Sequence, residues 1–391
     1  MKSVFVIDPG MMEAGGHHAA LLETLIHSES EDTKVSVLTH KHLDNELETK
    51  AKNNSIEVHR FFSSNFYQHY EDSLELSLSG MQHYIRLLAW EYAGAIKQAA
   101  QGNDNNEVVC FYPCLNWEHA SAISLALTTL TIDGERYLCT HKVSCMFRPL
   151  NINYQSEWLY KYSFGQLAKR SEVELFASDW ETREYYEDLG ITIQGFHPCY
   201  LLPWSSLNKQ KTTSSDTPHL LLYMGDAKEN KGFLRLPEVI TKAIAKFNGK
   251  VKLTVQYTLA WDYPELVPVI NTLKRLEKDY PAQVQIYTRF WSKDELQSVM
   301  TTLSGIVCAY DSFTYQNKSS GLAWVCGYYN LPIIFMSQQS FWMHREIERL
   351  GITYYHSLTD FADKTNDKPM PTRCNSYYSS LFEDCLTWVV N

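Results

Sequence analysis

Lysine side chains follow an apolar run near the middle of the chain. Residues 220–224 (LLLYM) form this run, and the loop after them carries Gly225, Asp226, Lys228 and Lys231. Lysines at the carboxyl end of a buried strand can neutralise a departing phosphate or diphosphate. Asp226 is a carboxylate that could act on a developing positive carbon or orient a lysine. The loop predicts an anion site; a solvated charged turn is the alternative.

A second polar loop follows an apolar strand that ends at Ala309. It leads into an apolar helix, and its candidate ligand-binding residues are Tyr315, Asn317, Ser319, Ser320 and Gly321. Serine and glycine at a helix start leave backbone N–H groups available to an anion. The segment therefore predicts a second contact for the same phosphate, with a plain helix cap as the alternative.

Glycines and histidines follow the first strand, 4–8. The loop and the helix start after it contain Glu13, Gly15, Gly16, His17 and His18. Glycines let a ligand approach the backbone closely. Either histidine could bind a sugar hydroxyl or accept its proton, and Glu13 is the nearest carboxylate for the same task. The spacing is not GxGxxG, which disfavours NAD binding, and a simple turn with His18 packed on the sheet is the alternative.

The elements that must position these residues follow an alternating pattern. Short β-branched runs alternate with helical patterns, which predicts parallel sheets wrapped by helices. A polar stretch at 204–217 predicts a linker between a domain at 1–203 and a domain at 218–370, and 371–391 predicts a C-terminal helix that crosses back to the first domain. The fold class is α/β, with two Rossmann-like doubly wound domains facing a central cleft at the carboxyl ends of their strands.

The predicted strands and helices can be stated as ranges. The strands are 4–8, 34–38, 56–61, 107–112, 137–140, 174–177, 191–195, 220–224, 252–257, 284–287, 305–309 and 332–336. The helices are 17–28, 79–100, 117–130, 158–169, 180–189, 236–247, 264–279, 292–302, 320–328, 341–350 and 376–389.

Composition excludes several classes of protein. The formal net charge of −10 leaves no basic excess to neutralise nucleic-acid phosphates, so we expect no nucleic-acid partner. The nine cysteines form no CxxC pair, which predicts buried thiols in a reducing compartment. No apolar run reaches the roughly 18 residues that span a bilayer, and no signal segment precedes the first strand. We expect a cytoplasmic protein, with peripheral contact at the inner face of a membrane.

Four short motifs carry a resemblance to a known family. They are Gly15-Gly16, Gly225 with Lys231-Gly232, Phe290 with Glu295-Leu296, and Asn330-Leu-Pro332-Ile-Ile. In this order they resemble the GT-B glycosyltransferases, and in particular the large retaining family that includes sucrose and glycogen synthase-like enzymes and bacterial polysaccharide transferases.

The resemblance implies a sugar transfer. A nucleotide-sugar donor would bind the second domain, where Lys231, Lys228 and the N–H groups at Ser320 and Gly321 would stabilise the departing phosphate. Arg289 follows the strand at 284–287, and from that place it could grip the phosphate or a donor carboxylate. A glycan or lipid-linked acceptor would bind the first domain near His18. It also implies retention of configuration and a role in bacterial surface polysaccharide or lipopolysaccharide synthesis. We expect no cofactor and no metal, because lysines and helix ends supply positive charge and no Asp-x-Asp pair occurs.

The chain departs from the family pattern at three positions. Asp226 stands where the family has arginine, and Asn317 and Val325 stand where it has two glutamates. Three alternatives follow: a Kdo- or sialic-acid-type transferase that uses a CMP-sugar with Asp226 as nucleophile, a catalytically inactive sugar-binding module, and a GT-B-like epimerase or phosphorylase.

Overall fold

The structure is a computed structural model. It describes residues 2–13, 16–28, 32–64, 66, 78–101, 107–132, 139–146, 148–149, 154–208, 217–259, 263–364 and 375–391. Gly15 lies outside the described residues, as does most of the linker expected at 204–217. The chain divides into unit 1, residues 1–206 and 379–391, and unit 2, residues 207–378.

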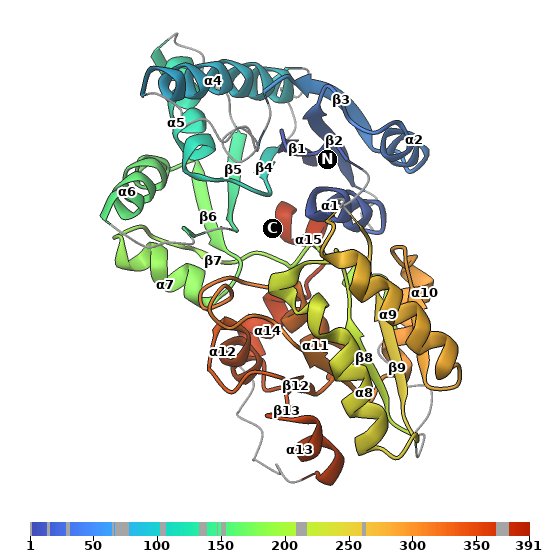
Figure 1. Cartoon of the computed structure of the whole chain (residues 1–391). Coiled ribbons are helices and arrows are strands. Elements are labelled where there is room, and N and C mark those ends of the chain that lie inside the picture. The colour runs from blue at the N-terminus through green and yellow to red at the C-terminus, as the bar shows by residue number, and fades with distance from the viewer. Residues whose placement is uncertain are drawn as a thin grey trace. The chain divides into compact units, whose positions relative to one another are not determined.

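Unit 1 is a parallel sheet covered by helices on both faces (Figure 1). Its strands are β1 (Lys2–Asp8), β2 (Thr33–His40), β3 (Glu57–Phe62), β4 (Glu107–Tyr112), β5 (Cys139–Cys145), β6 (Val173–Ala177) and β7 (Gly195–Phe196). Its helices are α1 (Gly16–Ile26), α2 (Asn45–Asn53), α4 (Leu78–Ala100), α5 (Trp117–Ile132), α6 (Tyr154–Ala168), α7 (Trp180–Asp188) and α15 (Cys385–Val390), with the 3₁₀ helix η1 (Trp204–Ser206). The strand order is β3-β2-β1-β4-β5-β6-β7.

Alternating side chains of these strands build two cores. Val4, Val6 and Phe111 point to the face covered by α1, α2 and α15. The next residue, Tyr112, points to the other face, where its ring meets Tyr92 of α4. Strands buried on both faces are typical of a parallel sheet, so the sequence shows continuous apolar runs there and no polar alternation.

Unit 2 repeats the same architecture. Its strands are β8 (His219–Tyr223), β9 (Lys252–Gln256), β10 (Val284–Tyr287), β11 (Gly305–Cys308), β12 (Ile333–Phe335) and β13 (Tyr354–Tyr355). Its helices are α8 (Leu236–Lys246), α9 (Leu266–Asp279), α10 (Lys293–Thr302), α11 (Gly321–Tyr329), α12 (Trp342–Arg349) and α13 (Leu358–Asp363), with η2 (Glu229–Lys231) and η3 (Phe233–Arg235); α14 (Asn375–Leu381) spans the unit boundary. The strands are parallel, in the order β10-β9-β8-β11-β12-β13. The sheet grows first to one side of β8 and then, from β11 on, to the other side, so the strand order reverses between β8 and β11.

The last residues of the chain belong to unit 1. In Figure 1 the red helix α15 lies beside the blue helix α1. Trp388 packs its ring against Phe111 and Phe176, and its carbonyl accepts a hydrogen bond from Lys142 Nζ at 3.1 Å.

Several predicted boundaries were wrong. The strand expected at 137–140 is β5, which runs to Cys145 through two polar side chains. Both are satisfied inside the protein: His141 Nδ1 lies 3.0 Å from Tyr112 Oη, and Lys142 binds the Trp388 carbonyl. The strand expected at 191–195 begins only at Gly195, and the single helix expected at 376–389 is two helices, α14 and α15. A new helix starts because the Asp384 side chain caps α15 by accepting from Thr387 N.

Among the described strands and α-helices, three were not predicted: α2, β13 and α13. Each is short or mostly polar, so hydrophobic periodicity gives no signal there. Among the described residues, no helix combines the length and apolarity needed to cross a membrane.

Candidate functional sites

Each unit has a cluster of chemically capable side chains at the point where its strand order reverses. In unit 2 the cluster follows β8 and β11, and in unit 1 it follows β1 and β4. Helices that leave neighbouring strands at such a point diverge to opposite faces of the sheet. The loops between them open a crevice in which α/β sheets bind ligands.

Lys231 is the central cation of the unit 2 cluster. It is half-buried, and burial lowers its pKa, with the positive charges of Lys228 and Lys318 acting in the same direction and Asp226 opposing them. A lysine whose pKa is lowered by burial and by two neighbouring lysines gains from binding an anion. The structure thus brings together Lys228 and Lys231, as the sequence predicted, and adds Lys318.

Glycines fix the path of the loop that carries Lys231. Gly225 has φ +113°, and a Cβ there would lie 3.7 Å from Lys231 Nζ. Gly232 has φ +81°, and a Cβ there would approach the Ala309 carbonyl oxygen to 2.3 Å. The loop after β8 therefore sits directly against the end of β11, an approach that only glycine permits.

Asp226 binds Thr258 and faces Lys228. Its Oδ1 accepts a hydrogen bond from Thr258 Oγ1 at 2.7 Å, and its Oδ2 lies 3.8 Å from Lys228 Nζ. The side chain is about one-third exposed. This geometry lets Asp226 hold Lys228 in place, while the carboxylate keeps access to solvent on one side.

The loop between β11 and α11 completes the cluster. Tyr310 Oη lies 3.2 Å from Ser320 Oγ, and Ser320 caps α11 by accepting from Leu322 N at 3.4 Å. Buried Tyr315 packs against Tyr310 with ring centroids 4.5 Å apart and the rings tilted by 44°, and Lys318 Nζ lies 5.4 Å from the Tyr315 ring centre. The N-terminus of α11 is thus held by tyrosines next to a lysine. The other predicted residues of this junction, Asn317, Ser319 and Gly321, are half-buried in it.

Arg289 is placed differently from the other predicted residues. Its guanidinium forms two hydrogen bonds with the Glu295 carboxylate, at 2.8 and 2.5 Å. Glu295 in turn caps the start of α10 together with Ser292. Because this exposed ion pair engages Arg289, a phosphate would have to compete with Glu295 for it.

In unit 1, a buried carboxylate holds His18. Asp8, at the end of β1, places Oδ2 2.8 Å from His18 Nδ1, and its Oδ1 accepts a hydrogen bond from Gly10 N at 3.0 Å. Asp8 is 1% and His18 7% exposed. The carboxylate fixes the ring orientation and favours the tautomer with a proton on Nδ1.

Gly10 makes room for the His18 ring. A Cβ on Gly10 would lie 2.3 Å from His18 Cε1 and 2.5 Å from Nε2, so any other residue would displace the imidazole. Gly16, with φ +78°, starts α1 in a backbone conformation that favours glycine. Glu13 is exposed in the loop before it.

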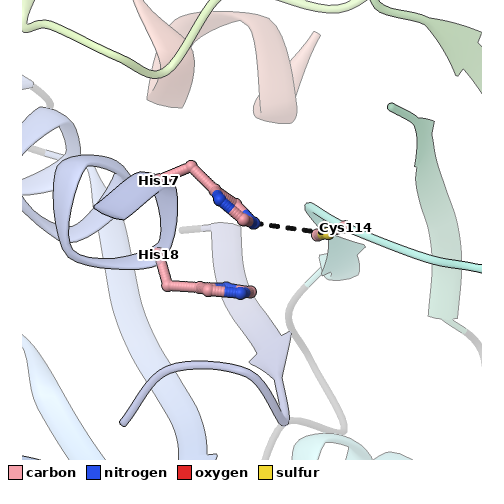
Figure 2. A group of neighbouring side chains, drawn as sticks. All are labelled: His17, His18 and Cys114. Carbon is pink, nitrogen blue, oxygen red and sulfur yellow. Dashed lines mark hydrogen bonds between the residues drawn. The ribbon is translucent and has the colours of Figure 1, made fainter. Parts of the chain in front are cut away.

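His17 lies beside His18 and reaches a cysteine of the neighbouring loop (Figure 2). Its ring centroid is 4.0 Å from that of His18, and its Nε2 lies 3.6 Å from Cys114 Sγ. Burial, followed by the charge of His18, lowers the pKa of His17 to about 3, and Asp8 opposes this shift. His17 is therefore a neutral imidazole at physiological pH. Burial raises the pKa of the Cys114 thiol.

Sequence reasoning missed Asp8, Gly10 and Cys114. Asp8 was the last residue of the predicted strand and Gly10 a loop glycine, while Cys114 was one of nine cysteines predicted to be buried thiols. The signal for Asp8 was its polarity at the end of an otherwise apolar strand. Nothing local marked Cys114, which is 97 residues from His17 in the chain.

Comparisons with known proteins give the fold. No protein-family model matches the sequence, and no curated protein shows significant similarity to it. Among solved structures, an α,α-trehalose-phosphate synthase (UDP-forming) from Burkholderia xenovorans in complex with glucose-6-phosphate matches with a TM-score of 0.56 and 9% identity, over 100% of this chain and 96% of that one.

Two further structures give the same result. A glycosyltransferase from Rickettsia africae matches with a TM-score of 0.53 and 10% identity, over 99% of this chain and 92% of that one. A UDP-GlcNAc 2-epimerase from Neisseria meningitidis bound to UDP-GlcNAc matches with 0.51 and 11%, over 100% of both chains. The predicted two-domain α/β fold of the GT-B class is confirmed; at such identities the likeness shows the fold alone.

Proposed function

We propose that this protein is a glycosyltransferase that takes its sugar from a nucleotide-sugar donor. The observation that carries the proposal is the half-buried Lys231, flanked by Lys228 and Lys318 and by the start of α11, at the strand-order reversal of unit 2. An anionic ligand gains at such a point, because positive side chains and the N-terminus of a helix lie around it.

The chemistry assigned to unit 2 is stabilisation of the leaving group. As the bond between the sugar and the phosphate breaks, negative charge develops on the phosphate oxygen. Lys231 and Lys228 neutralise this charge, helped by N–H groups at Ser320 and Gly321. Asp226 contacts Lys228 and would hold its ammonium group in position for the phosphate. Because fixed cations and helix dipoles supply the charge, the scheme needs no metal or cofactor at the donor.

The acceptor is assigned to unit 1. The Asp8–His18 pair supports a role for His18 in accepting the proton of an acceptor hydroxyl, since Asp8 holds Nδ1 and Nε2 is the basic nitrogen. On α6, exposed Trp158 and Tyr162 stack with centroids 5.5 Å apart, a surface that suits the apolar face of a sugar.

The family resemblance supports the narrower parts of this proposal. We infer a glycan or lipid-linked acceptor of bacterial surface polysaccharide or lipopolysaccharide synthesis, and transfer with retention of configuration. We also infer a cytoplasmic protein that contacts the inner face of the membrane peripherally.

Replacing Lys231 with methionine tests the leaving-group role. Met keeps the length of the apolar stem and removes the charge, so we expect turnover to fall about 10²–10³-fold, the usual cost of losing one such stabilising group. Lys250→Met, at an exposed position of the same unit, is the matched control and should retain turnover. Near-normal turnover in the Lys231→Met protein would sink this role.

The donor class comes from a thermal-shift panel of UDP, GDP, ADP, TDP and CMP. A ligand that binds only the folded state raises its melting temperature. A shift with one diphosphate supports the proposal and identifies the nucleotide. A shift with CMP alone favours the CMP-sugar alternative, in which Asp226 is a nucleophile, and no shift with any nucleotide favours the inactive sugar-binding module.

A nucleotide-sugar epimerase is a second candidate. The observation that favours it is the likeness to the Neisseria epimerase over the whole of both chains. Incubation of the donor without an acceptor separates the two functions. An epimerase converts it into an isomer with the nucleotide still attached, whereas a transferase needs an acceptor or releases free nucleotide slowly.

A further inference from the structure

Three potential metal ligands converge at the strand-order reversal of unit 1. In the described part of the chain, His17, His18 and Cys114 each offer one ligand atom, and these three atoms lie within 4.8 Å of one another. His17 and His18 come from the start of α1, and Cys114 comes from the loop after β4. Figure 2 shows both imidazoles extending from α1 toward the loop that carries Cys114.

The spacing fits a tetrahedral ion. Zinc–nitrogen distances of about 2.0–2.1 Å and zinc–sulfur distances of about 2.3 Å place neighbouring ligand atoms about 3.5 Å apart. His17 Nε2 and Cys114 Sγ are separated by 3.6 Å. The other pairs lie within 4.8 Å, so an ion bound by all three requires these atoms to move closer by at most about 1.3 Å.

The surroundings orient His18 as they do in known zinc sites. Asp8 Oδ2 binds Nδ1 at 2.8 Å, which leaves Nε2 as the nitrogen with a lone pair for an ion. Gly10 N holds the other oxygen of Asp8, and the missing Cβ of Gly10 gives the ring its place. A carboxylate behind a ligating histidine fixes both the tautomer and the angle of the ring.

We propose that His17, His18 and Cys114 bind one divalent transition metal ion of the zinc class, with Asp8 as the residue that positions His18. Two imidazoles and a thiolate select Zn²⁺ or Co²⁺ over Mg²⁺ or Ca²⁺, which require oxygen ligands. On binding, the Cys114 thiol gives its proton to solvent and the thiolate takes its place in the coordination. The fourth position stays open to water or an acceptor hydroxyl, as in metal sites that do chemistry.

This site does not rest on the proposed function. It departs from the expectation that the protein binds no metal, which rested on the positive groups available to the donor phosphate and on the absence of an Asp-x-Asp pair. If both proposals hold, the two uses of His18 Nε2 exclude each other, so an occupied site must activate the acceptor through the metal or block transfer.

Cobalt titration of the purified, reduced full-length protein tests the site without any activity assay. After dialysis against a chelator, we expect Co²⁺ to bind at one ion per chain, with a thiolate-to-cobalt absorption band in the near ultraviolet and visible bands of tetrahedral Co²⁺. Zn²⁺ should displace it and abolish the bands. Absence of the thiolate band, or binding only to other residues, would overturn the proposal.

Variants assign the ligands. Cys114→Ser should lose the thiolate band, and His17→Gln should lower the Co²⁺ affinity by at least an order of magnitude. Asp8→Asn should keep the band but weaken the Co²⁺ affinity about 10–100-fold, the usual effect of losing a group that hydrogen-bonds to a metal ligand. Cys139→Ser, a buried thiol of the same unit outside the cluster, is the matched control and should bind normally. An unchanged titration in both Cys114→Ser and His17→Gln would refute the assignment, and thermal unfolding without metal checks that each variant is folded.

Discussion

Glu118 shows how burial sets the charge state of a carboxyl on α5, the helix that follows the loop of Cys114. Its side chain is 6% exposed in the first turn of α5, and burial raises its pKa from 4.5 to about 7. A carboxyl with a raised pKa holds its proton in the folded state when the unfolded chain has already released it. Its contribution to stability is therefore fully present below about pH 4.5 and is lost as pH rises to about 7.

Glu118→Gln should remove this pH dependence. The full shift corresponds to roughly 3 kcal/mol, so we expect the variant to melt several degrees above the parent protein at pH 8 and the difference to vanish near pH 4.5. Comparing the two proteins cancels the opposite effect of buried His141 and His197, whose pKa values burial lowers to about 4. Exposed Glu184→Gln is the control. Equal melting temperatures of parent and variant at pH 8 would contradict the assigned burial effect.

At the scale of elements, the loop between β8 and α8 depends on one close backbone approach. Gly232→Ala should destabilise unit 2 and misplace Lys231 for two reasons. The new Cβ would lie 2.3 Å from the Ala309 carbonyl oxygen, and the alanine backbone would have to adopt φ +81°. Gly249→Ala separates the two effects, since Gly249 has φ +73° but only Gln283 Nε2 within reach, at 4.0 Å.

Denaturant unfolding measures the difference between these two variants. Gly249→Ala should lower the free energy of unfolding by about 1–2 kcal/mol, because alanine must adopt the left-handed backbone conformation. Gly232→Ala should cost more and should also lower turnover. Equal costs in the two variants would show that the loop relaxes away from β11 freely.

Elements with strong local patterns could be predicted, and those that depend on distant partners could not. The strand at 107–112 and the strand at 284–287 have the predicted bounds, because β-branched and aromatic residues make up most of each. β5 was misplaced because the partners that satisfy His141 and Lys142 are Tyr112 and the Trp388 carbonyl, the latter 246 residues away from Lys142.

The candidate sites follow the same rule. Lys228, Lys231 and Ser320 were named from the sequence because each stands next to a strand end or a helix start whose position periodicity reveals. Asp8 and Cys114 were not, because their importance comes from contact with His18 and His17 across the strand-order reversal. A single sequence contains the residues of such a contact but not their pairing.

At the scale of the whole molecule, the chain leaves unit 1 after Ser206 and completes it only with its last residues, 379–391. The core of unit 1 on the α1 face includes Cys385, Leu386, Trp388 and Val389 of α15. Unit 2 must therefore be synthesised before unit 1 can bury this face. The stability of unit 1 is in this way tied to the far end of the chain.

Truncation before Cys385 tests this dependence. Removing α15 exposes the apolar face that Trp388 covers, and loss of this tryptophan alone should cost about 3–5 kcal/mol. We expect hydrogen exchange to rise throughout β1, β4 and α1, while the amides of β8 and β9 in unit 2 keep their protection. Removal of only the exposed Asn391 is the control. If the truncated protein retained full protection in β1 and β4, α15 would not contribute to the stability of unit 1, and unit 1 would fold without the end of the chain.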